Sequence, residues 1–193
     1  MPKLGMEPIR RAALVKATIA EVGQAGSLDV TVAQIARRAG MSTALAHHYF
    51  GTKERMFLAA MRHILTLYGA EVRGALAAAE GPRARLVGVI RANFSASNFR
   101  REVISAWLNF YVLAQTMPEA RRLLRVYQGR LRTNLVHDLR ALVGPRAEAV
   151  AGGVGAMIDG VYIRAALSSG VPDGRGAAGE VLACLYAHMG EAG

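Results

Sequence analysis

The sequence predicts an all-α protein with a three-helix head at the amino terminus and a larger helical domain after it. Apolar residues make up 52% of the 193 positions and recur at helical spacing along most of the chain. Hairpin signals such as asparagine-glycine are few, and no segment alternates in the manner of a strand. We place the first domain at residues 1–52 and the second at residues 53–193.

A first helix is expected from about Pro8, a residue suited to the first turn, to Val22. Gly23 and Gly26 would end it. Its inner positions should face the two helices that follow, and these positions are Leu14, Ala17, Thr18 and Val22. A basic lead-in, which lies either along a phosphate backbone or in solvent, is formed by Lys3, Arg10 and Arg11.

Residues 31–50 predict two short helices joined by a tight turn. Thr31 and Gln34 have the spacing of a capping box, so the first helix begins at Thr31. Gly40 would end this helix, and Ser42 would cap the next. The connection has the length found in a helix-turn-helix unit, whose second helix enters the major groove of DNA.

The second of these short helices is expected to read DNA while Leu45 and Phe50 anchor it to the core. Its outward hydroxyl, methyl and imidazole groups suit base edges, and Tyr49 and Lys53 suit phosphates. The candidate DNA-binding residues are Thr31, Ser42, Thr43, Ala44, His47, His48, Tyr49 and Lys53. The alternative is an ordinary helical hairpin with a solvated basic face. The net charge of +10 favours a polyanionic partner without locating its site.

A long helix should follow from Thr52 to about Ala79, with an apolar side that includes Phe57, Met61 and Tyr68. Beyond the Gly81-Pro82 break, helices are expected at about 83–98, 101–115, 118–142, 146–169 and 174–190. There is no internal repeat and no long linker, so these helices should form one domain.

The segment Thr31-Val-Ala-Gln-Ile-Ala-Arg-Arg-Ala-Gly-Met-Ser, followed by His48-Tyr49-Phe50 and Lys53, resembles the TetR family of bacterial transcriptional regulators. The resemblance implies a helical effector domain and a homodimer whose heads occupy successive major grooves of double-stranded operator DNA. Ala46 and His47 depart from the family pattern, which often has a leucine and an aromatic residue there.

A closer resemblance, to the choline-responsive BetI subgroup of that family, is carried by residues 1–11, 33–43, 106–110 and 158–167. That subgroup represses the genes that convert choline to the osmoprotectant glycine betaine. The resemblance implies a repressor that choline releases from DNA. The alternative is a TetR-type repressor that responds to another small cationic or hydrophobic ligand.

A choline sensor must hold a quaternary ammonium, which donates no hydrogen bond and is best met by aromatic faces and a carboxylate. Candidate effector-binding residues on two of the expected helices are Trp107, Phe110, Tyr111, Asp159 and Tyr162. Aromatic residues at helical spacing are also common in cores. Buried Asp159 would need compensation, either from a cationic ligand or from a basic side chain such as Arg164.

Glycines at 152, 153, 155 and 160 should weaken their helix by about 1 kcal/mol each relative to alanine. Close packing against another helix, such as a symmetry mate across a dimer interface, is our preferred explanation. A local break that lines a pocket is the alternative.

Enzymatic activity is not expected. Cys184 with His188, and His47 with His48, lack the further ligands of a zinc site, and phosphate loops and nucleophile elbows are absent. We therefore expect no catalytic residues, metal or cofactor. The single cysteine, the absence of a signal peptide and the absence of a long apolar run predict a cytoplasmic protein without a membrane partner.

Overall fold

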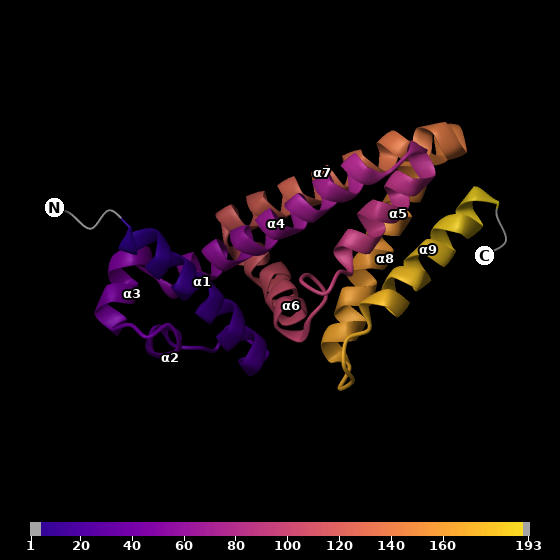
Figure 1. Cartoon of the computed structure of the whole chain (residues 1–193). Helices are drawn as coiled ribbons and strands as arrows, with labels where there is room; N and C mark the ends of the chain where they lie inside the picture. The colour runs from indigo at the N-terminus through magenta and orange to yellow at the C-terminus, as the bar shows by residue number, and fades with distance from the viewer. Residues whose placement is uncertain (1–4, 191–193) are drawn as a thin grey trace.

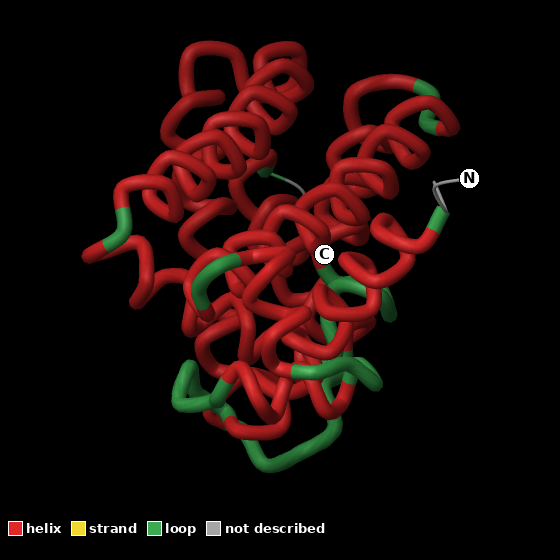
Figure 2. The backbone as a smooth tube through the Cα atoms, turned by 90° about the vertical axis from the view of Figure 1, so that its left-hand side faces the viewer, coloured by secondary structure: helices red, strands yellow, loops and turns green. Residues whose placement is uncertain are grey.

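The computed structural model describes residues 5–190, and helices account for most of them (Figures 1 and 2). In chain order the helices are α1 (Met6–Ala25), α2 (Val32–Arg38), α3 (Thr43–Phe50), α4 (Lys53–Ala78), α5 (Gly81–Asn93), α6 (Arg101–Thr116), α7 (Pro118–Val143), the short 3-10 helix η1 (Gly144–Arg146), α8 (Ala147–Leu167) and α9 (Gly174–Met189). No strand occurs within residues 5–190, and the all-α class is confirmed. The basic residue Lys3 lies outside the described residues.

Helices α1–α3 form the head, at the left of Figure 1, and α4 runs from the head along the body formed by α4–α9. Figure 2 views the molecule from the head side. Helix α1 packs on α4 and α6, while α7 packs on α5, α6 and α8. The buried apolar core is continuous from α1 to α9. Because the core continues across residue 52, the division into domains 1–52 and 53–193 stays a prediction.

The first helix is longer than expected at both ends, since α1 begins at Met6 and ends at Ala25. The prediction that Gly23 ends it was wrong, because Gly26 does so with a left-handed φ of 68°. Gly23 serves a different purpose. A Cβ atom there would lie 2.5 Å from the Cα of Glu102 on α6, so the absence of a side chain lets the two helices approach closely.

Polar side chains of α6 complete the carboxyl end of α1. The Ser105 hydroxyl donates to the carbonyl of Val22 at 3.3 Å, and the Asn109 amide donates to the carbonyl of Gly26 at 3.3 Å. The Val22 carbonyl also accepts from the N–H of Gly26 at 2.9 Å, whereas the Gly26 carbonyl, like the last carbonyls of any helix, has no partner within the helix itself. Helix α6 therefore fixes both the distance and the position of the last turn of α1.

The predicted helix at 83–98 is also wrong at its end, because α5 stops at Asn93. In the following turn, the Asn98 side chain donates to the carbonyl of Ala92 at 2.9 Å and to the Ser95 hydroxyl at 3.1 Å. Such side-chain bonds compete with continuation of a helix. The other body helices begin and end within about two residues of the predicted positions.

One stretch of helices is apolar enough, by length and composition, to cross a membrane. It runs from residue 118 to residue 167 and contains a window of mean hydropathy 1.3. Within that stretch, Val150, Val154 and Ile158 of α8 are buried in the protein core. Core helices of globular proteins commonly have such windows, and the expectation that this chain has no membrane partner stays a prediction.

The contact at Gly23 gives a first test. Gly23→Ala should destabilise the protein by about 1–3 kcal/mol, because its Cβ would push against the α6 backbone. Gly74→Ala on α4 is the control, since its Cβ meets nothing within 4 Å and alanine favours a helix by up to about 1 kcal/mol. Chemical unfolding at one fixed chain concentration measures both. Equal stability of the two variants would contradict the close contact between α1 and α6.

Candidate DNA-binding and effector sites

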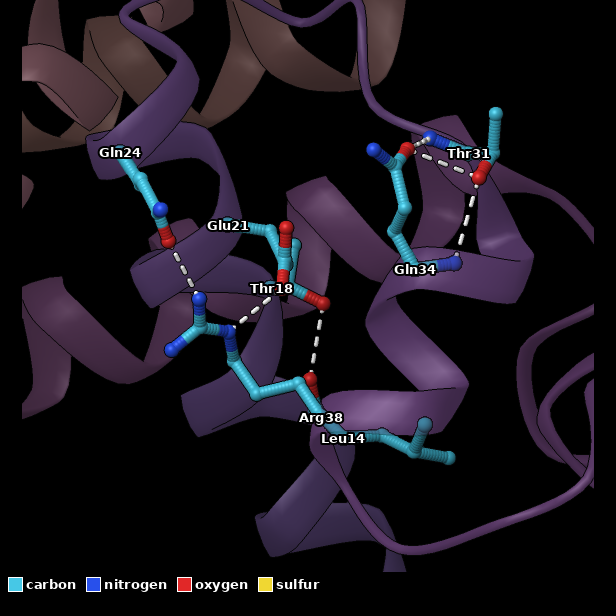
Figure 3. A network of polar contacts seen from close by, with 7 residues as sticks. All are labelled: Leu14, Thr18, Glu21, Gln24, Thr31, Gln34 and Arg38. Carbon is cyan, nitrogen blue, oxygen red and sulfur yellow. Dashed lines mark hydrogen bonds and ion pairs between the residues drawn. The ribbon is translucent and has the colours of Figure 1, made fainter.

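The turn between α2 and α3 is built from caps, as the sequence predicts. The backbone N–H of Gln34 donates to the Thr31 hydroxyl at 3.2 Å, and the Thr31 N–H donates to the Gln34 side chain at 2.7 Å (Figure 3). The backbone N–H of Leu45 donates to the Ser42 hydroxyl at 3.2 Å. Gly40 between the helices has a φ of 67°. The capping box and the start of α3 are therefore confirmed.

Helix α2 is held against α1 by a polar clamp. The guanidinium of Arg38 contacts Glu21 and Gln24 at 2.5 Å each (Figure 3). On the same side, the buried Thr18 hydroxyl donates to the carbonyl of Leu14 at 2.8 Å and so needs no outside partner. Three fully buried side chains join α1, α2 and α3, namely Leu14, Ile35 and Ala46.

The outward face of α3 consists of exposed polar and small residues, which are Thr43, Ala44, His47 and His48. Its inner face differs slightly from expectation, because Leu45 and Phe50 are half-buried while Ala46 is completely buried. His47 Nδ1 lies 2.7 Å from the carbonyl of Gly51 and donates to it, which leaves Nε2 as the free ring nitrogen.

Arg11 does not extend into the surroundings as a basic lead-in would. Its guanidinium lies 5.3 Å from the ring centre of Tyr49 and 5.2 Å from that of Phe50, and it donates to the Tyr49 carbonyl at 2.7 Å. Glu7 accepts from Arg11 at 2.8 Å. Arg11 therefore supports the carboxyl end of α3, a role that sequence reasoning missed because it depends on two segments 38 residues apart.

Lys53 begins α4 and is half-buried. Its ammonium donates to the carbonyl of Leu28 at 2.9 Å and so ties the loop before α2 to the start of α4. The Thr52 hydroxyl caps α4 by accepting from the N–H of Arg55. A contact between Lys53 and phosphate stays a prediction.

The five predicted effector residues come together in the body. The ring centre of Trp107 lies 5.8 Å from that of Phe110, 5.9 Å from Tyr111 and 6.3 Å from Tyr162. Two residues missed by sequence reasoning join them, since Tyr127 of α7 lies 4.7 Å from Trp107 and Tyr68 of α4 lies 5.5 Å from Tyr127. We call these six rings the aromatic cluster. The sequence pattern placed Tyr68 only on the apolar side of its helix, and neither Tyr68 nor Tyr127 has an aromatic neighbour at helical spacing, so neither was predicted as an effector residue.

Buried hydroxyls of the aromatic cluster point toward Asn93. Tyr162 donates to the Asn93 carbonyl at 2.5 Å, and Tyr127 donates to the Asn93 side chain at 3.3 Å. Tyr68 lies beside the same side chain without a well-formed hydrogen bond. Burial raises the pKa of Tyr68 to about 12, so this phenol is neutral at physiological pH.

Asp159 is half-buried at one edge of the aromatic cluster, where the Tyr111 hydroxyl donates to its carboxylate at 2.7 Å. Burial raises the pKa of Asp159, and the hydrogen bond from Tyr111 partly opposes this change. Of the alternatives for compensating Asp159, the one that invokes Arg164 is wrong, because Arg164 lies 3.3 Å from Glu180. No cationic side chain within residues 5–190 forms an ion pair with Asp159, and the arginine that lines the same cavity, Arg132, pairs with Glu148 at 2.6 Å.

Two cavities share Tyr127 and Leu131 as wall residues. One of about 270 Å³ lies between α7 and α8 and reaches Asp159, and we call it the effector cavity. The other, of about 580 Å³, lies between α4 and α7.

The glycines of α8 stand in a continuous helix, so the alternative of a local break is wrong. A Cβ at position 152, 153, 155 or 160 would meet nothing within 4 Å, so no close packing within the chain explains these glycines. Gly152 and Gly155 do line the effector cavity. No cluster of three potential metal ligands occurs in the part of the chain that the structure describes.

Comparison with known proteins agrees with this architecture. Residues 14–60 match the family described as bacterial regulatory proteins, tetR family, and residues 82–189 match the BetI-type transcriptional repressor, C-terminal family. A protein of Brucella anthropi called HTH-type transcriptional regulator BetI is 55% identical over 174 residues, which cover 90% of each chain. A Rhizobium meliloti protein of the same name is 50% identical and covers 88% of this chain and 84% of its own.

Solved structures share the fold. A putative transcriptional regulator from Pseudomonas aeruginosa PAO1 is 26% identical and covers 97% of this chain and 93% of its own, with a TM-score of 0.74. A putative regulator from Saccharomonospora viridis, solved in complex with choline, is 20% identical and covers 89% of this chain and 93% of its own, with a TM-score of 0.77. The protein is thus a DNA-binding transcriptional repressor rather than an enzyme, and it belongs to the TetR family with a BetI-type carboxy-terminal region.

Proposed function

We propose that choline, or a quaternary ammonium of similar size, binds beside Asp159 and releases this repressor from the operator of choline-to-glycine-betaine genes. The observation that carries the proposal is the carboxylate of Asp159, which has an aromatic hydroxyl as its partner and no cationic one among residues 5–190. A buried carboxylate of this kind favours a cation that needs no hydrogen-bond acceptor.

The surroundings of Asp159 suit a small methylated cation. Tyr127 lines the effector cavity together with Asp159, and each of these two residues contacts another ring, since the ring centre of Trp107 lies 4.7 Å from that of Tyr127 and Tyr111 donates to Asp159. Aromatic faces attract a quaternary ammonium through the ring quadrupole, by about 0.5–2 kcal/mol for each well-placed ring. The names of the relatives and the choline bound to the Saccharomonospora viridis protein support the same ligand class.

Helix α6 supplies a route from the effector to the head. One side of α6 carries Trp107 and Tyr111 at the aromatic cluster, and another side carries Ser105 and Asn109 against the end of α1. A ligand shifts an equilibrium only when it binds two states unequally. We infer that choline favours a position of α6 that displaces α1. This displacement changes the distance between the two heads of a dimer, so that they no longer fit successive major grooves of the operator.

On the DNA side, we propose that Thr43, Ala44 and His48 select bases from the exposed face of α3, and that Tyr49 and Lys53 position the phosphate backbone. Thr31, Ser42 and His47 maintain the ends of α2 and α3 while lying at the same surface. The domains at residues 1–52 and 53–193 serve these two binding functions. Because its target is operator DNA, the protein acts in the cytoplasm.

We propose further that the protein is a homodimer, since a single α3 spans too few base pairs for useful specificity. Beyond the part of α8 that lines the effector cavity, this helix has an exposed apolar face toward its carboxyl end, formed by Ile163 and Leu167. Helix α9 has a similar exposed face formed by Gly176, Gly179, Ala183 and Ala187. Close packing of these faces against a second copy would account for Gly179, which has open space around it within one chain.

The charge of Asp159 can be tested by calorimetry with choline. Asp159→Asn keeps an acceptor for Tyr111 but removes the charge, so choline affinity near neutral pH should fall by roughly tenfold, or about 1.4 kcal/mol. Operator affinity without choline should stay unchanged. Trp107→Phe, which retains a ring, serves as the milder comparison. Equal choline affinity in wild type and Asp159→Asn would reject the site, and no binding at millimolar choline would reject choline without affecting the DNA-binding function.

The same titrations predict a pH dependence. Choline prefers the ionised carboxylate, so its affinity should be constant at high pH and fall as the pH decreases through the pKa of Asp159. Because burial raises this pKa above the ordinary 3.8, the decline should begin at a higher pH than for an exposed aspartate. The choline affinity of Asp159→Asn should not change with pH over the same range. An identical decline in the variant would assign the pH dependence to another group.

The division of DNA contacts can be tested by titrating operator and random duplex at several salt concentrations. Lys53→Ala should weaken binding to both duplexes alike and reduce the salt slope by about one phosphate contact. Thr43→Val should change base preference and leave the slope intact. Thr66→Val is the matched control, because this exposed threonine lies on α4 and its hydroxyl donates to Arg62 of the same helix. A changed base preference in Lys53→Ala with an intact slope would reverse the assigned roles.

The dimer face can be tested by substituting two aliphatic residues of equal exposure, one on the proposed face and one outside it. Ile163 on α8 and Leu67 on α4 are each 42% exposed. Ile163→Arg should produce monomers in sedimentation at micromolar concentration and weaken operator binding, whereas Leu67→Arg should leave the mass unchanged. If Ile163→Arg remains as dimeric as wild type, the interface lies elsewhere.

A further inference from the structure

The larger of the two cavities is a groove between α4 and α7, which lie side by side in Figure 1. Its volume of about 580 Å³ falls within the range of small-molecule sites. The groove shares Tyr127 and Leu131 with the effector cavity but is bounded by α4 instead of α8. Apolar side chains form much of its lining, and they include Leu65, Val72, Leu76, Leu123 and Val126.

Two glycines in helix interiors keep the groove wide. Gly69 lies on the α4 wall and Gly129 lies on the α7 wall. A Cβ at Gly129 would meet nothing within 4 Å, and one at Gly69 would meet only the end of the Arg73 side chain, at 3.3 Å. Each glycine weakens its helix by about 1 kcal/mol relative to alanine. Neither is required by backbone packing, so the space that they leave is their main structural effect.

The charges of the groove are all positive. Arg73, Arg125 and Arg130 line it, and no acidic residue does. None of the three arginines forms an ion pair with a residue in the described range 5–190. The effector cavity differs, because it contains Asp159 and its arginine, Arg132, pairs with Glu148 at 2.6 Å.

We propose that the α4–α7 groove is a second ligand site, which binds an amphipathic anion such as a medium-chain fatty carboxylate. The alkyl chain lies on the apolar lining between Gly69 and Gly129, and the carboxylate pairs with the arginines, whose guanidinium groups bind carboxylates in a bidentate manner. The same charges exclude quaternary ammonium ligands from this groove. Since the two sites share Tyr127, a ligand at one changes affinity at the other, and the coupling is reciprocal.

Calorimetry with two probes of equal tail length tests the charge preference. Decanoate should bind saturably with one molecule per chain, at least about tenfold more tightly than decyltrimethylammonium, and its affinity should fall with added salt. Choline is added in a separate titration to report the effector cavity. Equal or tighter binding of decyltrimethylammonium, or no saturable binding of decanoate at millimolar concentration, would overturn the proposal.

Variants of the groove test its location. Gly129→Met fills open space on an exposed helix position and should weaken decanoate binding by about tenfold or more, whereas Gly74→Met, outside the groove on α4, should not. Arg125→Gln with Arg130→Gln should also weaken it, and Arg122→Gln, an exposed arginine of α7 outside the groove, is the control.

Operator affinity without ligand should be unchanged in all these variants, which checks that the heads remain intact. Decanoate binding that survives both the filled groove and the double arginine variant would place the anion elsewhere and overturn the assignment. Loss of choline binding alone would count against the proposed effector function and leave the groove assignment unaffected.

Discussion

Helix α6 has to satisfy two packing partners at once. On one side it lies so close to α1 that position 23 of α1 has room for a glycine alone, and its Ser105 and Asn109 complete the last turn of α1. On another side, Trp107 and Phe110 are buried in the aromatic cluster. The interior of a protein is packed too densely to absorb a shift at one contact without moving the other. The position of the head therefore depends on the packing of rings within the body.

The two proposed ligand sites, the effector cavity and the α4–α7 groove, differ in the sign of their unpaired charges. The chain as a whole carries a net charge of +10, which suits a protein that binds DNA. Against this background, Asp159 presents an uncompensated carboxylate at the aromatic cluster, while the α4–α7 groove presents arginines without acids. Two adjacent cavities of opposite charge are able to select ligands of opposite charge although they share the same tyrosine wall.

The parts of the fold that the sequence predicted are those governed by local rules. The capping box at Thr31, the cap at Ser42 and most helix ends depend on residues within one turn of each other. The end of α5 was misplaced because Asn98 makes bonds that compete with the helix.

Contacts between distant segments were not predictable in the same way. Packing of Arg11 on Tyr49 and the approach of Tyr127 to Trp107 both require the tertiary fold. Spacing did indicate that Trp107, Phe110 and Tyr111 share one helix, and that Asp159 and Tyr162 share another. The finding that Tyr111 is the partner of Asp159 instead of Arg164 could come only from seeing how α6 and α8 meet.

The hydrogen bonds from Ser105 and Asn109 to the end of α1 also bear on how such regulators can be recombined. A head transferred to another body would leave the Gly26 carbonyl without its Asn109 donor, and the Val22 carbonyl with the Gly26 N–H alone, unless the new body supplied equivalent side chains at the corresponding positions of its own α6. A successful chimera therefore has to be cut so that α1 and α6 are exchanged as a matched pair, even though 75 residues separate the end of one from the start of the other.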